Sequence, residues 1–233
     1  MSEKAMRTGF YWPTMKRDAQ HLVKRCRKCQ IFGNLCQKSA NDLTPIVSPL
    51  PFAKWGMDIL GPFPPASGQR KFVLVAVDYF TKWVEAAPLK SITTSDVQGF
   101  IWKNLITRFG VPLSIVFDNG PQFETPRLKT WLSDQGIAAH FAAVAHPQSN
   151  GQVEAFNKII SAGIRKKLDK AKGLWAEELY NVLWSIRITT KNSTGETPFM
   201  LVYGAEVVLP IDMYEPTLRV MLYDEEANWP ECN

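Results

Sequence analysis

Short runs of apolar residues, separated by Gly, Pro, Asn and Ser, recur along the chain from about residue 52. Runs of this length and composition are typical of β-strands. They predict five strands, over residues 55–60, 71–80, 83–88, 113–117 and 138–144. Because residues 73–77 are all apolar, we expect the second strand to lie in the centre of a sheet that is covered on both faces.

Apolar residues at helical spacing predict four helices between and after these strands. The first has Ser95 and Asp96 as candidate caps and ends at Gly110. In the second, Thr125 is a good N-cap and Pro126 suits the first helical position. The other two cover residues 152–170 and 175–190. Three successive strands followed by alternating helices and strands predict an α/β fold, with a mixed sheet flanked by helices.

The first part of the chain differs in composition from the rest. Apolar residues at helical spacing predict a short amphipathic helix that begins near Met15 and runs into Cys26. Residues 38–51 contain three prolines and no aromatic residue, as is typical of an extended linker. We therefore expect an N-terminal segment, a linker, a main domain and an acidic tail, over residues 1–38, 39–51, 52–210 and 211–233.

The overall composition narrows the class of protein. With 233 residues, 45% of them hydrophobic and 21% charged, the chain resembles globular proteins and not disordered, collagen-like or coiled-coil ones. The longest apolar run, Phe72 to Val77, is far shorter than the roughly 18 residues of a membrane span, so we expect no membrane segment. The N-terminus lacks the apolar stretch of a signal peptide. The four cysteines are therefore expected to be thiols or metal ligands in a reducing compartment, not disulfides.

The net charge of +5 is unevenly distributed. Residues 1–38 hold nine Lys or Arg and two acids, net +7, whereas the remainder holds 18 basic and 20 acidic side chains. Within that remainder, residues 205–233 hold seven acids against Arg219 alone. Two interpretations fit this pattern. The basic end faces a polyanion, or it is a solvated surface with a chance imbalance of charge, and the charge alone does not choose between them.

Three carboxylates stand out by their positions. Asp58 lies within an apolar strand, where an unpaired charge would cost several kcal/mol. Asp118 follows a buried strand, at the end of a strand where α/β sheets place ligand-binding groups. Glu154 lies in the first turn of the third helix. Because the two strands carry no Lys or Arg to pair with these groups, the pattern predicts a divalent-metal site.

Each carboxylate also has a plainer interpretation. Asp118 in an Asp-Asn-Gly turn is a common turn residue. Glu154 at a helix start is stabilised by the helix dipole. Asp78, also at a strand end, and Glu85 compete with Asp58 for the first position. Its place at the centre of a buried strand favours Asp58.

The spacing and the surrounding motifs indicate a family. Between Asp118 and Glu154 lie 35 residues. The chain here resembles the integrases of retroviruses and LTR retrotransposons, most of all the integrase region of gypsy-type retrotransposon polyproteins of plants. The resemblance runs from about Gly9 to Pro210, and its motifs are WGMDILGPFP, VAVDYFTKWVEAAPL, GVPLSIVFDNGPQF, HPQSNGQVEAFNK and GETPFMLVYGAEVVLP.

The resemblance implies a ribonuclease-H-like catalytic core, a five-stranded mixed sheet with flanking helices. It also implies that Asp58, Asp118 and Glu154 form a triad that binds two Mg²⁺ or Mn²⁺ ions. The implied reactions are trimming of the 3′ ends of a DNA copy and transfer of those ends into host DNA, by in-line displacement at phosphorus. From this resemblance we also expect DNA as the partner, a homo-oligomeric active form and no membrane association. We expect the protein to act in the nucleus, with assembly in the cytoplasm as a further option.

The third helix is also expected to contact DNA. Its apolar residues fall on one face, whereas Glu154, Lys158 and Arg165 form a second stripe, which places cations beside the metal carboxylate. A solvated helix face is the alternative for Arg165 and, less so, for Lys158. The resemblance implies that Lys158 touches the DNA end. It further assigns nucleic-acid contacts to Gln152, Asn157, Asn119 and Gln122.

Cys26 and Cys29 form a Cys-x-x-Cys pair in the basic N-terminal segment. The pair resembles the second half of the His-His-Cys-Cys zinc module that precedes integrase cores, and the eight residues before Gly9 contain no histidine. A redox pair and a different ligand set that adds His21 and Cys36 are alternatives. We therefore expect a zinc half-site in a partly folded segment.

Some features depart from the family pattern. Phe117 replaces a small hydroxyl residue before the second aspartate, and Pro121 stands where Thr or Ala is usual. The chain stops soon after Met213, so the DNA-binding region that follows integrase cores is not expected here. The alternatives to an active integrase core are a catalytically silent remnant or host-adopted DNA-binding protein, and a stand-alone ribonuclease H.

Overall fold

The structure of the chain is a computed structural model. It describes residues 5–6, 9–27, 48–118, 120, 122–141, 151–168 and 173–208, and within the helix at 151–168 it describes side chains for residues 156–165. Cys29, Cys36, Asn119, Pro121 and the acidic tail lie outside the described residues.

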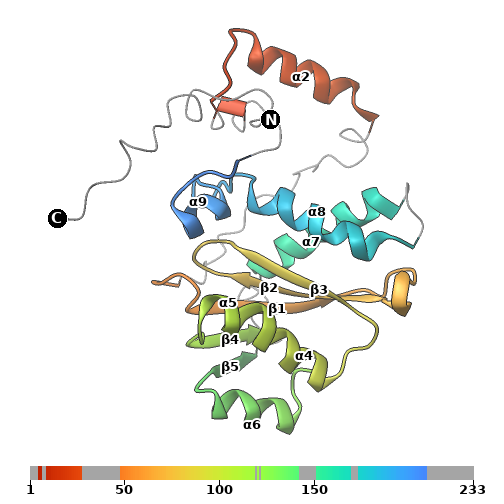
Figure 1. The fold of residues 1–233 in the computed structure, drawn as a ribbon, viewed down its shortest axis with the longest axis vertical. Helices are drawn as coiled ribbons and strands as arrows, with labels where there is room; N and C mark the ends of the chain where they lie inside the picture. The colour runs from red at the N-terminus through yellow and green to blue at the C-terminus, as the bar shows by residue number, and fades with distance from the viewer. Residues whose placement is uncertain are drawn as a thin grey trace, which may run out of the picture.

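Five strands form one mixed sheet in the order β3-β2-β1-β4-β5 (Figure 1). Their bounds are β1 (Lys54–Leu60), β2 (Phe72–Asp78), β3 (Val84–Leu89), β4 (Ser114–Phe117) and β5 (Ala138–Phe141). The strands β1, β2 and β3 are antiparallel neighbours, whereas β4 is parallel to β1 and β5 is parallel to β4. All five predicted strands are present. The strand β2 ends two residues early because the Lys82 N–H donates to the Asp78 carbonyl and closes a turn.

Helices cover both faces of this sheet (Figure 1). On one face lie α4 (Thr94–Phe100), a wider π-type segment (Ile101–Ile106), α5 (Thr107–Phe109) and α6 (Pro126–Asp134). On the other face lie α7 (Gly151–Leu168) and α8 (Trp175–Arg187), followed by α9 (Pro198–Tyr203). The first three segments form the one continuous helix that was expected, and α9 was not expected.

The N-caps of α4 and α6 test the predicted helix starts. Thr93, not Ser95, caps α4: its hydroxyl accepts from the Asp96 N–H at 3.1 Å, and the Asp96 carboxylate accepts from the Thr93 N–H at 3.0 Å. The prediction for Ser95 was wrong because this reciprocal capping box satisfies two free N–H groups, which a cap at Ser95 would leave open. Thr125 caps α6 as expected, accepting from the Leu128 N–H at 3.3 Å.

The central strand β2 separates two hydrophobic cores. Its odd-numbered residues, Val73, Val75 and Val77, pack with residues of α7 and α8. Its even-numbered residues, Leu74 and Ala76, pack with residues of α4, α5 and α6 and their neighbours. Alternating side chains of one strand therefore serve both cores, and the expectation of a strand covered on both faces is confirmed.

The helices α7 and α8 approach each other closely at Gly163. A Cβ atom at this position would lie 2.7 Å from the Val182 Cγ1 atom. Real Cβ atoms do not come this close, so glycine is the residue that allows this approach. The contact fixes α7 against α8 on the face of the sheet that carries Asp58.

The N-terminal helix α2 (Met15–Arg25) lies where the amphipathic pattern predicted it. The Asp18 carboxylate accepts from the Thr14 hydroxyl at 2.6 Å and from the Trp12 indole N–H at 2.8 Å. Met15 is buried, whereas Leu22 is exposed. Among the described segments of the chain, no helix combines the length and the apolar character that crossing a membrane requires.

Candidate active site

Asp58 on β1 and Asp118, which directly follows β4, occupy neighbouring positions along two parallel strands. The preceding residues, Met57 and Phe117, are partners in the β1–β4 register, and the Asp118 N–H donates to the Met57 carbonyl at 3.4 Å. Neighbouring strands lie about 4.8 Å apart. Because side chains alternate along a strand, both aspartates share the face of the sheet that α7 and α8 cover. Two aspartates that are 60 positions apart in the chain are thus brought to one place on the sheet.

A side chain of α7 contacts the first of these carboxylates. The Asn157 side-chain N–H donates to Asp58 Oδ2, and the Ile59 backbone N–H donates to Asp58 Oδ1 at 2.7 Å. Asn157 is 7% exposed, and its Oδ1 atom is buried with no hydrogen-bond partner among the described residues. A buried acceptor without a donor is rare in proteins and points to a group that binds there. This acceptor, on the side chain that bonds to Asp58, suits the water of a hydrated divalent cation.

Glu154 lies on α7, three residues before Asn157. One helical turn therefore separates its backbone from the residue that contacts Asp58. The side chains of Glu154 and Gln152 lie outside the described residues. The structure thus brings together Asp58 and Asp118 and places the backbone of Glu154 on the helix that packs over them. Among the side chains that the structure describes, no group of three or more His, Cys, Asp or Glu could hold a metal ion.

Asp78, the competing candidate, has a different role. It is fully buried, and its carboxylate accepts from the Phe52 N–H at 3.1 Å, the Thr81 N–H at 2.8 Å and the Thr81 hydroxyl at 2.7 Å. Burial raises the pKa of Asp78 above its ordinary value, although these hydrogen bonds act in the opposite direction. It pairs with Trp55, three residues before Asp58 along β1. These contacts make Asp78 a residue that holds the β2–β3 turn.

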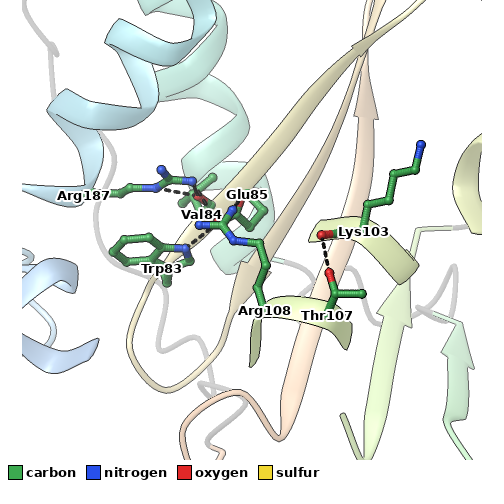
Figure 2. Close-up of polar contacts among 7 residues, drawn as sticks. All are labelled: Trp83, Val84, Glu85, Lys103, Thr107, Arg108 and Arg187. Atoms are coloured by element: carbon green, nitrogen blue, oxygen red, sulfur yellow. Dashed lines mark hydrogen bonds and ion pairs between the residues drawn. The ribbon is translucent and has the colours of Figure 1, made fainter. Parts of the chain in front are cut away.

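Glu85, the other competitor, is buried in an ion-pair cluster (Figure 2). Its carboxylate pairs with Arg108 at 2.7 Å and Arg187 at 3.0 Å and accepts from the Trp83 indole N–H at 2.7 Å. Arg187 also donates to the Val84 carbonyl and lies over the Trp83 ring, 4.4 Å from its centroid. Figure 2 shows the two guanidinium groups converging on Glu85 from different helices. The negative charge of Glu85 is therefore paired with two arginines, and its carboxylate accepts a hydrogen bond from Trp83; none of these partners is Asp58.

The predicted stripe of α7 is present where side chains are described. Phe156, Ile160 and Ile164 are buried, whereas Lys158 and Arg165 are exposed. Asn157, which was expected to contact nucleic acid, is buried and bonds to Asp58. Exposure of the two cations is compatible with contact to a polyanion and with simple solvation.

The loop after Asp118 is anchored by aromatic packing. Phe117 is fully buried, and its ring lies 4.9 Å from that of Phe123. The Phe123 N–H donates to the Gly120 carbonyl at 2.9 Å, and the Gln122 side chain lies against Gly120. Phe117, which departs from the family pattern, therefore fills a core position that secures the loop.

The position of Lys191 beside α7 was not predicted from the sequence. The Lys191 ammonium lies 5.0 Å from the centroid of the Phe156 ring on α7. Lys191 belongs to the turn after α8, far from α7 in the sequence. No motif or periodicity connects the two residues, so the fold alone shows their proximity.

Two family matches cover most of the described chain. Residues 48–147 match the integrase core domain, and residues 2–34 match the integrase zinc binding domain. The chain is 29% identical over 201 residues to the Pro-Pol polyprotein of simian foamy virus type 3 (strain LK3), covering 86% of this chain and 17% of the relative. It is 31% identical over 199 residues to the Gag-Pol polyprotein of feline leukemia virus, covering 85% of this chain and 11% of the relative. The chain thus spans less than a fifth of the length of these polyproteins.

Solved structures share the fold. The catalytic core domain of BIV integrase has a TM-score of 0.52 and 25% identity, covering 64% of this chain and 92% of that one. The HTLV-2 integrase catalytic core domain in complex with magnesium, in a trimeric form, has a TM-score of 0.53 and 24% identity, covering 66% and 98%. A chain of the simian T-cell lymphotropic virus intasome in complex with the PP2A regulatory subunit B56 gamma has a TM-score of 0.62 and 21% identity, covering 90% and 78%.

These likenesses confirm the fold class expected from the sequence, the ribonuclease-H-like core of integrases. The match to a zinc binding domain and the polyprotein relatives agree with this likeness. In its sequence matches and in its fold, this chain is similar to the core domain and the zinc binding domain of integrases.

Proposed function

We propose that this chain is the catalytic part of a DNA-integrating polynucleotidyl transferase, with Asp58, Asp118 and Glu154 as its metal ligands. The observation that carries the proposal is the meeting of Asp58 and Asp118 on adjacent parallel strands, with Asn157 of α7 bonded to Asp58. Aspartates at the ends of two neighbouring strands, with Glu154 on the helix that packs against β1, supply the kind of hard oxygen ligands that Mg²⁺ and Mn²⁺ prefer.

The residues around the aspartates fit this role. Asn157 and the Ile59 N–H fix the orientation of the Asp58 carboxylate, as outer ligands do in metal sites. Asn157 Oδ1, which no described residue bonds, offers an acceptor for a hydrated ion or a nucleotide donor. When bound, two divalent ions would supply the charge stabilisation that in-line displacement at phosphorus requires. Asp58, Asp118 and Glu154 then act by position and charge and form no covalent bond to DNA.

DNA is the proposed substrate and partner. The exposed Lys158 and Arg165 of α7 and the basic N-terminal residues support it, because phosphate contacts by Lys and Arg supply most of the affinity for nucleic acid. Gln122 beside Gly120 is proposed as a further DNA contact near Asp118, and the same role is proposed for Asn119 and Gln152. We place this activity in the nucleus, on host DNA.

Self-association and lineage complete the proposal. Tyr180 and Trp184 lie one turn apart on α8 and are 68% and 41% exposed. Large exposed aromatic side chains are enriched in association surfaces, which supports a homo-oligomer.

The motifs favour a gypsy-type retrotransposon of plants as the source. In the N-terminal segment, Cys26 and Cys29 are proposed as zinc ligands.

A strand-transfer assay on labelled DNA with Mn²⁺ tests the proposal. We expect the wild type to join DNA ends to a target duplex and Glu154→Gln to lose this activity. Asp134→Asn is the matched control, because Asp134 is an exposed acid on α6, on the opposite face of the sheet. Equal activity of the wild type and Glu154→Gln would contradict the triad. DNA binding without any joining by the wild type would instead identify a silent DNA-binding protein.

A further inference from the structure

The Lys191 side chain occupies an unusual place for a cation. Its ammonium lies over the ring of Phe156, which is 7% exposed and belongs to the core between the sheet and α8. In the part of the chain that the structure describes, the ion pairs involve Arg70, Arg108 and Arg187, and Lys191 has none. A cation over an aromatic ring is attracted to the ring face, but this attraction does not neutralise its charge.

The backbone of Lys191 is held in place by a closed turn between α8 and α9. Its N–H donates to the Glu196 carbonyl at 3.0 Å, and its carbonyl accepts from the Thr194 N–H at 3.2 Å and the Gly195 N–H at 2.8 Å. Gly195 has a φ of 72°, which favours glycine. The turn therefore sets the direction in which the side chain leaves the backbone, and the ammonium reaches α7 because of the fold.

The electrostatic surroundings of this ammonium are unfavourable. Burial removes water from its charge and lowers the pKa of Lys191 to about 8. An anion bound at this place would offset the lost hydration and supply the counter-ion that the described residues do not provide.

We propose that Lys191 binds a backbone phosphate of the nucleic acid substrate on the side of α7 that faces α8. The inference rests on the proposed function, because a phosphodiester is the anion that a DNA-integrating enzyme brings to α7. Lys158 projects about 200° around the helix from Phe156 and is exposed. Cations thus stand on two sides of the helix that carries Glu154. A phosphate contact of this kind sets the position of the strand and does not read its sequence.

The salt dependence of DNA binding tests the contact, because each phosphate contact contributes about 0.9 to the slope of log Kd against log salt concentration. We expect Lys191→Met to lower this slope by about 0.9 in fluorescence anisotropy with a labelled duplex, and Lys191→Arg to retain it. Lys103→Met is the matched control, since Lys103 is an exposed lysine of the helix on the opposite face. We expect this control to keep the wild-type slope.

Two results would overturn the inference while the proposed function stands. One is an unchanged slope for Lys191→Met, and the other is an equal decrease for Lys191→Met and Lys103→Met, which would reflect net charge alone. A wild type that binds no DNA would overturn the proposed function as well. If Lys191→Met melts at a lower temperature than the wild type, Lys191→Gln replaces it, because glutamine keeps a polar group at this half-buried position.

Discussion

The Asn157 side chain donates a hydrogen bond from α7 to the Asp58 carboxylate on β1, across 99 residues of sequence. This bond ties the helix of Glu154 to the strand of the first aspartate. It therefore fixes the distance between two proposed metal ligands that lie on different elements. Within the described part of the chain, the oxygen of the same side chain is buried and has no hydrogen-bond donor, which is expected of a residue that completes its contacts when a ligand binds.

Replacing Asn157 by Ala should lower strand-transfer activity by about 10- to 100-fold, as loss of an outer contact to a metal ligand typically does. The helix should remain folded, because alanine favours helices. Activity should be measured over a Mn²⁺ titration, where a shift to higher metal concentration separates a metal-site effect from a general loss. Asn181→Ala on α8, which removes an exposed hydrogen bond to Glu178, is the control. Equal losses in both variants would argue against the role given to Asn157.

Asp78→Asn should lower the free energy of unfolding by about 1 to 3 kcal/mol, because an amide cannot replace every hydrogen bond that the buried carboxylate accepts. The strand-transfer activity of the folded variant should equal that of the wild type. Denaturant titration measures the first quantity and strand transfer the second. Loss of activity without loss of stability would mean that Asp78, and not Asp58, serves the metal site.

The raised pKa of Asp78 also predicts a pH dependence. In the unfolded chain this carboxyl loses its proton near its ordinary value of 3.8, whereas burial keeps it protonated to a higher pH in the folded protein. Between the two values the unfolded state binds fewer protons, so the stability that Asp78 contributes falls as pH rises. Denaturant titrations of the wild type and Asp78→Asn across this window should therefore differ most at its acidic end. A difference that grows with pH would contradict the assignment.

Breaking the Glu85 cluster should be costly. Glu85→Ala leaves Arg187 without a counter-ion in a largely buried place, and removal of one partner from a buried ion pair typically costs about 3 to 5 kcal/mol. Thermal unfolding followed by circular dichroism would measure the loss. Glu177→Ala is the control, because its pair with Arg70 is exposed and 3.8 Å long. The prediction fails if the two variants melt at the same temperature.

Gly163→Ala should destabilise the protein by about 1 to 3 kcal/mol, although alanine is the better helix former. The added methyl group would lie 2.7 Å from Val182 Cγ1 and push α7 and α8 apart. The double variant Gly163→Ala with Val182→Ala should recover part of the loss, since it removes the clash. Gly99→Ala on α4 has open space around it and should be neutral or stabilising. Chemical unfolding of the wild type and the three variants would measure these differences in the free energy of unfolding.

The strands and their approximate ends could be predicted because apolar runs between turn residues carry local information. The β1–β4 register and the contact of Asn157 with Asp58 could not, because they depend on long-range pairing that no periodicity encodes. The family resemblance still assigned Asp58 and Asp118 to one site, and the structure brings the two residues to neighbouring strand positions. The burial of Asn157 could not be predicted, because its polarity alone does not show that it lies against Asp58.

Charged residues were the hardest to place from sequence. Glu85 and Asp78 looked like alternatives to Asp58 until the structure gave them partners from α8, α5 and the β2–β3 turn. Thr93 was missed as a cap because Ser95 and Asp96 follow it with equally suitable side chains. Lys191 carried no sequence signal, because its relation to Phe156 arises from the packing of a turn against a helix.

The bonds from Arg187 to the Val84 carbonyl, at 3.0 Å from Nε and 2.8 Å from Nη2, have a consequence for solubility. β3 is the outermost strand of its side of the sheet, and outermost strands offer unpaired backbone groups to strands of other molecules. Arg187 already occupies one such carbonyl, and its pairing with Glu85 holds it there. A foreign strand that added at Val84 would first have to displace a guanidinium from a buried carboxylate, so the cluster protects this border of the sheet against aggregation.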